Sequence, residues 1–220
     1  MLSLDMSNIK IMVKTGSKEL FEILRDACIG ILDLKTADCA SLASEILHTL
    51  NKLTKLDLWG TYTGCCDIEL PASLQCISLQ KGECSSEWLC SLLITLSSFD
   101  HPVTCELWAV VLQSSGYTLR DELHTHVSDL RSKIMSHDMS KIEIMVTKGS
   151  KKLFEILRYT SIRILDLRTA DCASLASEIL HTLNKLTKLY LRGAYTGRCD
   201  IELPASLQCI SLQKVECSSE

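Results

Sequence analysis

The chain has 220 residues, of which 46% are hydrophobic and 23% charged, so it can bury a core and is not compositionally disordered. A net charge of -4 and a pI near 5.9 exclude the strongly basic surface that phosphate-driven binding needs, so we expect no nucleic-acid partner. No segment approaches the roughly 18 uninterrupted apolar residues of a membrane helix, and the start lacks a secretory signal pattern. We therefore expect a cytoplasmic protein without membrane contact.

A short apolar pattern, L-x-x-L-x-L, recurs along the chain and predicts a series of short strands. The first unit contains Met6, Ile9 and Ile11, and later units begin at residues 29, 53, 74, 102, 139, 162, 186 and 207. Positions four and six of each unit alternate with their neighbours. This period of two is typical of a strand with one buried face.

Amphipathic helices are predicted between several of these strands. The segments KELFEILR (18–25) and ASLASEILHTL (40–50) place apolar residues at helical spacing, and WLCSLLITLSS (88–98) predicts a more deeply buried helix. Ser17 and Asp38 precede the first two segments, and both residue types are favoured as helix N-caps.

The longest step between units lies between residues 102 and 139. Within it, residues 115–134 (SGYTLRDELHTHVSDLRSKI) space their apolar side chains like a long amphipathic helix. His124 and His126 lie in this segment and His137 follows it. Because positions two apart face different sides of a helix, we expect a solvated surface here and not a metal site.

An internal duplication spans most of the chain. Residues 5–87 align without a gap with 138–220, and 15 of the 83 aligned positions differ. The stretch TADCASLASEILHTLNKLTKL occurs unchanged at 36–56 and 169–189. We therefore expect a single array over 1–220, in which a degenerate repeat and a long helix at about 88–137 join two copies that fold alike.

Steps of 21 to 28 residues with helical segments between strands resemble a leucine-rich repeat protein. The pattern is most similar to the ribonuclease-inhibitor-like repeats of NACHT-type innate immune sensors. The resemblance implies an α/β solenoid, with a curved parallel sheet and helices on its convex side. It also implies a protein-interaction or ligand-sensing role within a larger innate-immune-type receptor. We accordingly expect the chain to be a fragment of a longer protein.

In such an array the strand positions between the apolar ones point to the concave face. Positions five and seven of the units set acids beside bases and include tryptophans, which together with Tyr and Arg are common interface anchors. The resulting candidate binding residues are Lys10, Asp33, Lys35, Asp57, Trp59, Gln80, Glu106, Trp108, Glu143, Asp166, Arg168, Tyr190 and Arg192. Alternatively, the two tryptophans only cover strand edges. Concave positions also change more often between the copies than the rest, so we expect a copied scaffold with an altered binding face.

The chemical alternatives have weaker support. Asp38, Cys39 and His48 suggest a thiol site, but nine residues of helix would separate Cys39 from His48 by roughly 13 Å. A thiol nucleophile needs its base within hydrogen-bond reach, so we expect Cys39 and Cys172 to fill the core. The segment KTGSKEL (14–20) lacks the residue order of a phosphate loop. The twelve cysteines form no C-x-x-C pair, which predicts reduced thiols and no zinc site.

We therefore predict a repeat scaffold without enzymatic activity, cofactor or metal, whose partner is a protein or peptide. Two alternatives stay open at this point. One is a structural repeat without a defined ligand. The other is a hydrolytic or thiol-dependent enzyme, which would bring a Cys and a His within hydrogen-bond distance of each other.

Overall fold

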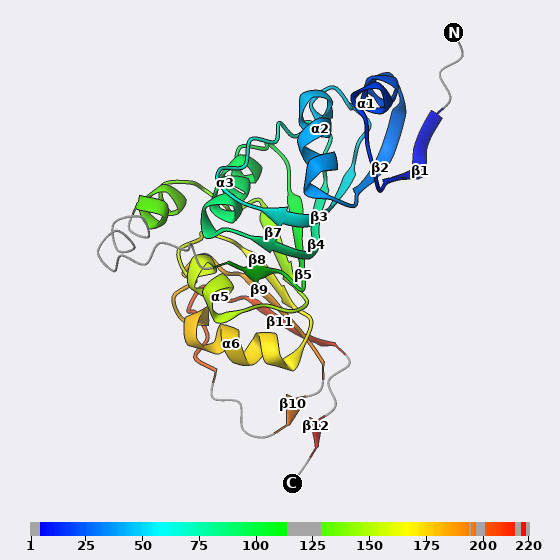
Figure 1. Ribbon diagram of the computed structural model, residues 1–220. Helices are drawn as coiled ribbons and strands as arrows, with labels where there is room; N and C mark the ends of the chain where they lie inside the picture. The colour runs from blue at the N-terminus through cyan, green and yellow to red at the C-terminus, as the bar shows by residue number, and fades with distance from the viewer. Residues whose placement is uncertain (1–4, 114–128, 194, 197–200, 214–216, 219–220) are drawn as a thin grey trace.

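The computed structural model describes residues 5–113, 129–193, 195–196, 201–213 and 217–218 (Figure 1). Ten strands form one parallel sheet in which β1, β2, β3, β4, β5, β7, β8, β9 and β11 follow one another in chain order, while β6 pairs with β4. The expected parallel α/β arrangement is confirmed. Two further short strands, β10 and β12, pair with each other.

The strands have the bounds β1 Asp5–Val13, β2 Cys28–Leu34, β3 Lys55–Tyr62, β4 Cys76–Cys84, β5 Val103–Trp108, β6 Val111–Leu112, β7 Ile142–Val146, β8 Ile164–Leu167, β9 Lys188–Arg192, β10 Tyr195–Thr196, β11 Cys209–Gln213 and β12 Cys217–Ser218. The helices are α1 Lys18–Arg25, α2 Ala37–Leu47, α3 Ser86–Ser97, α5 Lys151–Leu157 and α6 Ala170–Leu180. None of the helices in these described ranges combines the length and apolar character needed to cross a bilayer.

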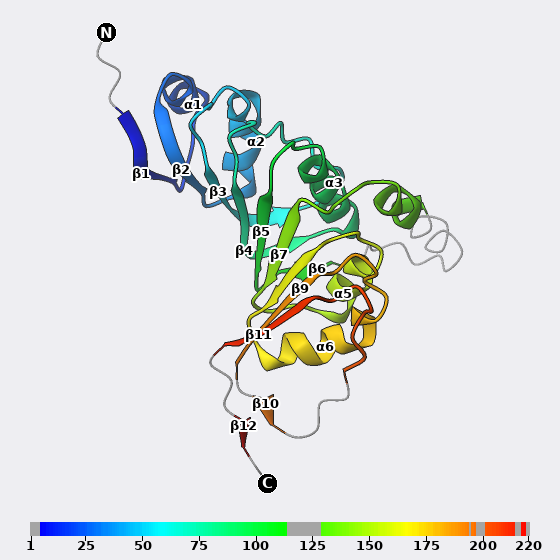
Figure 2. The same cartoon turned by 180° about the vertical axis from the view of Figure 1, so that it is seen from behind.

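The helices lie along the outer side of the curved sheet, and the labelled elements leave the inner side uncovered (Figures 1 and 2). Apolar strand residues face the helices. In β2 and β3, for example, Leu32, Leu34, Leu56 and Leu58 are completely buried. Burying such a side chain contributes about 1.5–3 kcal/mol, so the core between sheet and helices holds the array together and leaves the inner face available.

The helix starts were predicted with mixed success. Ser17 caps α1, as expected, because its side chain accepts a hydrogen bond from the Leu20 backbone N–H. The prediction for Asp38 was wrong: Thr36 caps α2 and accepts from the Cys39 backbone N–H at 3.2 Å. Asp38 lies in the first turn, where a carboxylate interacts favourably with the helix dipole. The same arrangement recurs at Thr169 in α6.

Met6 pairs with Ile29 as predicted, but the register shifts between Met6 and Lys10, so the rest of β1, like β7 in the second copy, is displaced by two residues from the predicted register. Met12 pairs with Asp33, and Met145 pairs with Glu106. Lys10 and Glu143, which were predicted at position five, therefore occupy position three instead. The alternation of Ile9, Ile11 and Val13 allows either register, and a shift by two preserves the face that each side chain occupies.

Two predictions concern residues 88–137. The unit predicted at 102 contains strand β5, in which Cys105 and Leu107 are completely buried. Of the predicted long helix, residues 129–135 are helical. The remainder of that segment, including His124 and His126, lies outside the described residues.

A glycine near the carboxyl end of β3, at the irregularity between Trp59 and Thr61, permits a close approach of this strand to helix α2. Gly60 has φ +121°, and an added Cβ would lie 2.8 Å from the Ala37 backbone nitrogen. Gly193 has the same conformation at the end of β9, where the added atom would lie 3.2 Å from the Ala170 nitrogen. The carboxyl end of each strand thus packs directly against the start of a helix.

Candidate binding face

The thirteen candidate residues all lie in strands or one residue beyond a strand's carboxyl end. The sheet register brings several of them into one row, in which Asp33, Asp57, Ser78, Glu106, Met145, Asp166, Tyr190 and Ser211 are successive neighbours. A second row, two residues earlier, contains Lys10, Ile31, Lys55, Cys76, Thr104, Glu143, Ile164, Lys188 and Cys209. The candidates therefore form a continuous surface on the inner side of the sheet.

The first copy buries two carboxylates on this surface and surrounds them with lysines. Asp33 is 1% exposed and Asp57 is 5% exposed. Lys10 Nζ lies 2.8 Å from Asp33 Oδ2 and 3.0 Å from Asp57 Oδ2, so it bridges strands β2 and β3. Lys35 Nζ approaches Asp33 Oδ2 to 3.0 Å. Burying an unpaired charge is costly, and these ammonium groups neutralise the two acids.

The contacts around Asp33 are electrostatic and not well-aligned hydrogen bonds. Both of its carboxylate oxygens are buried, and neither has a partner with hydrogen-bond geometry among the described residues. Burial would raise the pKa of the Asp33 carboxyl, but Lys10 and Lys35 outweigh that effect and hold the pKa below its ordinary value. The neighbouring acids, Asp33 first, raise the pKa of Lys10.

Lys55 connects the first copy to the degenerate repeat. Its Nζ donates to Glu106 Oε2 at 3.0 Å across strand β4, and lies 3.8 Å from Asp57 Oδ1. Burial would lower the pKa of Lys55, yet the Glu106 contact raises it overall. Cys76 is the neighbour of Lys55 in the second row, and burial raises the pKa of its thiol to about 11, so this cysteine remains protonated at neutral pH.

The second copy neutralises its buried acid with arginines. Asp166 is 1% exposed. Arg192 binds it through two contacts, with Nε donating to Oδ1 at 3.1 Å and Nη2 lying 3.0 Å from Oδ2. Arg168 Nε donates to Oδ2 over a longer distance of 3.4 Å. Paired contacts of the Arg192 kind fix the guanidinium plane as well as its position.

Glu143 is the acid that replaces Lys10 in the second copy. It is half-buried on β7, where burial first and the charge of Asp166 second raise the pKa of its carboxyl. The cations of Lys188, Arg192 and Arg168 act in the opposite direction and only partly offset the shift.

Both tryptophans lie beneath a cation of this face. The Lys35 ammonium is 3.9 Å from the Trp59 ring centroid, and the Arg168 guanidinium carbon is 5.8 Å from the Trp108 centroid. Each indole Nε1 is buried without a hydrogen-bond partner within the described part of the chain. The rings are half-buried, so part of each ring contributes to the inner surface.

When the observed register is used to assign the concave positions, a larger share of the sequence differences between the two copies falls on the inner face than the predicted register gave. Seven of the 20 positions with concave placement differ, against eight of the remaining 63. The seven differing positions are Lys10, Lys14, Thr15, Gly30, Lys35, Asp57 and Trp59 in the first copy.

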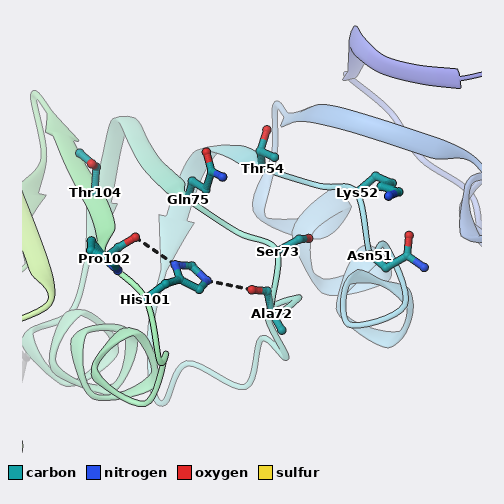
Figure 3. Close-up of a pocket in the computed structure, with 9 residues that line it drawn as sticks. All are labelled: Asn51, Lys52, Thr54, Ala72, Ser73, Gln75, His101, Pro102 and Thr104. Carbon is teal, nitrogen blue, oxygen red and sulfur yellow. Dashed lines mark hydrogen bonds between the residues drawn. The ribbon is translucent and has the colours of Figure 1, made fainter.

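A separate pocket of about 590 Å³ opens at the amino-terminal edge of strands β3 to β5 (Figure 3). Most of the residues that line it have polar side chains, although apolar atoms contribute the larger part of its surface; they are Asn51, Lys52, Thr54, Ala72, Ser73, Gln75, His101, Pro102 and Thr104. His101 Nε2 lies 2.8 Å from the Ala72 carbonyl oxygen and Nδ1 lies 3.0 Å from that of Pro102. These carbonyl contacts raise the pKa of the His101 imidazole, because only the doubly protonated ring donates to both.

Nothing in the described part of the chain assembles the thiol site considered above. Cys39 is 2% exposed and Cys172 is 1% exposed, as expected of core residues. His48 is exposed and its Nδ1 lies 3.4 Å from Glu69 Oε2. Among the described residues, no three His, Cys, Asp or Glu side chains gather as metal ligands.

The sequence prediction omitted Lys55, Lys188 and the His101 pocket. The two lysines alternate with the apolar strand residues just as Asp57 and Tyr190 do, so the period of two already places them on the inner face. His101 gives no such signal, since its partner Ala72 contributes only a backbone carbonyl from a preceding turn.

Comparison with protein-family models gives no match for this chain, and comparison with curated proteins gives none either.

Proposed function

We propose that the chain is a leucine-rich-repeat-type scaffold that binds a protein or peptide on the inner face of its sheet. The observation that carries this proposal is a parallel sheet with one face covered by helices and the other left open, charged and aromatic. Parallel sheets are ordinarily covered on both faces, so an extended segment of a partner is a suitable second cover.

The composition of the open face supports recognition. A purely structural sheet gains little from buried carboxylates, because an apolar side chain of similar size is often at least as stabilising as a buried ion pair. Here Asp33, Asp57 and Asp166 are nevertheless buried on the inner side, each beside a cation. Trp59 and Trp108 add large amphipathic surfaces of the kind that dominate binding energies.

The two copies provide matched substitutions for a test. Trp59→Arg on the inner face and Glu19→Lys on α1 each insert the residue that the other copy carries at the equivalent position, so both fit the fold. Peptides would be selected from a random display library on the full chain, and their affinities compared for the two variants by fluorescence anisotropy.

We expect Trp59→Arg to weaken the selected peptides by about tenfold or more, equivalent to about 1.4 kcal/mol, while Glu19→Lys leaves them unchanged. Peptides that respond to Glu19→Lys but not to any inner-face substitution would place binding on the helices and refute the proposal. The further proposal of a place in an innate-immune-type receptor rests on the repeat resemblance alone. A cytoplasmic location and a non-enzymatic role are proposed from the sequence patterns described above.

A further inference from the structure

The geometry points to a carboxylate-binding site on the second copy, in which Arg168, flanked by Trp108, holds an acidic side chain of a peptide partner. This inference rests on the proposed function and gives the partner its chemistry. It is based on a difference between two equivalent cations, Lys35 in the first copy and Arg168 in the second, in how they contact the buried aspartate beside them.

In the first copy the equivalent cation is already engaged. Lys35 Nζ lies 3.0 Å from Asp33 and 3.9 Å from the centre of the Trp59 ring. Residue 59 is a tryptophan and cannot neutralise Asp33, so Lys35 must share that task with Lys10. No cation of this group is in excess, because Lys10, Lys35 and Lys55 face Asp33, Asp57 and Glu106.

In the second copy the residue equivalent to Trp59 is Arg192, and it takes over the buried acid. Its two contacts with Asp166, at 3.1 and 3.0 Å, are shorter than the 3.4 Å contact from Arg168. Arg168 directs only its Nε toward Asp166, and the side chain is 28% exposed. Its terminal nitrogens therefore remain as donors at the surface, held in orientation by Asp166 and by the Trp108 ring.

The charge of the group favours a carboxylate over a phosphate. Arg168, Arg192 and Lys188 carry three positive charges, and Asp166 and Glu143 carry two negative charges, which leaves one positive charge in excess. A single carboxylate balances this excess, whereas a phosphate dianion would bring surplus negative charge next to Glu143. A planar carboxylate also matches the fork of the guanidinium.

The test uses the full chain and two short fluorescein-labelled peptides, one of Glu and Gly and one of Gln and Gly. We expect the Glu peptide to bind about tenfold more tightly than the Gln peptide, with the difference reduced by salt. Arg168→Gln should remove this selectivity. Lys35→Gln, the same change at the equivalent position of the first copy, should leave it intact. Glu143→Gln should tighten binding of the Glu peptide several-fold, because it removes a repelling charge.

A charge-neutral exchange separates the site from general electrostatics. The triple variant Glu143→Lys, Tyr190→Asp and Arg192→Trp installs the first-copy residues, which fit this scaffold, and leaves the net charge unchanged. We expect it to bind the Glu peptide no better than the Gln peptide. Retained selectivity in this variant, an equal effect of Lys35→Gln, absence of Glu-peptide binding, or tighter binding of a phosphoserine peptide would each overturn the inference.

These outcomes also separate the inference from the function on which it rests. Equal binding of both peptides that is lost on Trp59→Arg or Arg168→Gln would leave the inner face as the binding surface and reject only the carboxylate chemistry. Binding of both peptides that no inner-face substitution alters would reject the proposed function as well.

Discussion

The first copy neutralises its buried carboxylates with lysines from three strands, whereas the second copy uses two arginines beside a single buried aspartate. Four exchanges account for this difference: Lys10 corresponds to Glu143, Lys35 to Arg168, Asp57 to Tyr190 and Trp59 to Arg192. Lys35 and Arg168 carry the same charge, and the other three residues of each copy sum to a net charge of zero. The comparison teaches that a repeat can alter the chemistry of its face while the parallel pairing of the strands beneath it is kept, provided that the charge balance over the buried acids is kept as well.

The largest loss of stability is expected in the hydrophobic core, where the two copies have the same residues. Leu32→Ala in β2 and Leu165→Ala in β8 each empty a completely buried site between sheet and helices. Each should lower the free energy of unfolding by about 2–5 kcal/mol, as measured by urea denaturation monitored by circular dichroism. A loss confined to one copy would contradict the view that both share one framework.

A smaller loss of stability should distinguish the inner face of the second copy from that of the first. Arg192→Met leaves Asp166 with only the longer Arg168 contact, and we expect a loss of about 1–3 kcal/mol. Lys10→Met should cost less, since Lys35 still neutralises Asp33 and the Lys10 side chain is 45% exposed.

The control for the Arg192→Met variant removes the buried charge of Asp166 as well as the cation of Arg192. Adding Asp166→Asn to Arg192→Met should restore part of the stability, because the buried charge that needed neutralising is gone. If Lys10→Met proved the more damaging of the two changes, the assignment of Arg192 as the main partner of a buried acid would be wrong.

The helix caps should behave identically in the two copies. Thr36→Ala and Thr169→Ala each remove an N-cap acceptor and should cost about 1 kcal/mol. Asp38→Ala serves as the control and should cost less, because that carboxylate only interacts with the helix dipole. Thermal unfolding would rank the three variants, and a larger loss for Asp38→Ala would reinstate it as the cap.

The smallest effect concerns a contact that the described residues show only beside the first copy. His101 holds the Ala72 carbonyl, whereas no histidine of the described segments reaches Ala205, the equivalent of Ala72. Because folding raises the His101 pKa, its stabilising contribution is complete below the unfolded value near about 6.5 and is lost as pH rises through the folded value. The stability difference between wild type and His101→Gln should therefore shrink between acidic and alkaline pH, and a difference that grew with pH would refute the contact.

Much of this architecture could be predicted because periodicity reports burial directly. The alternation around Leu56 and Leu58 identifies a strand, and the spacing within KELFEILR identifies a helix that the structure places at the same residues. Register in the first unit was not predictable in this way, since Ile9, Ile11 and Val13 satisfy two alignments equally well.

The site was predictable as a face but not as a set of contacts. Alternation places Asp33, Asp57 and Asp166 on the inner side, yet it does not reveal that Lys10 reaches across two strands or that Arg192 binds its acid in a paired manner. Those contacts depend on sheet curvature and side-chain length, which residue spacing alone does not encode.

The unchanged segment at 36–56 and 169–189 has a consequence for how this chain reaches its native state. Helices α2 and α6 have the same sequence, the same type of N-cap and the same buried positions, so local chemistry does little to distinguish the correct arrangement from the exchanged one. Connectivity must do so: joining β2 to α6 in place of α2 lengthens the connection from residues 35–36 to residues 35–169, and the longer loop costs roughly 3–4 kcal/mol more to close. We therefore expect refolding to pass through misassembled species, and at high concentration through chains that exchange equivalent segments with one another.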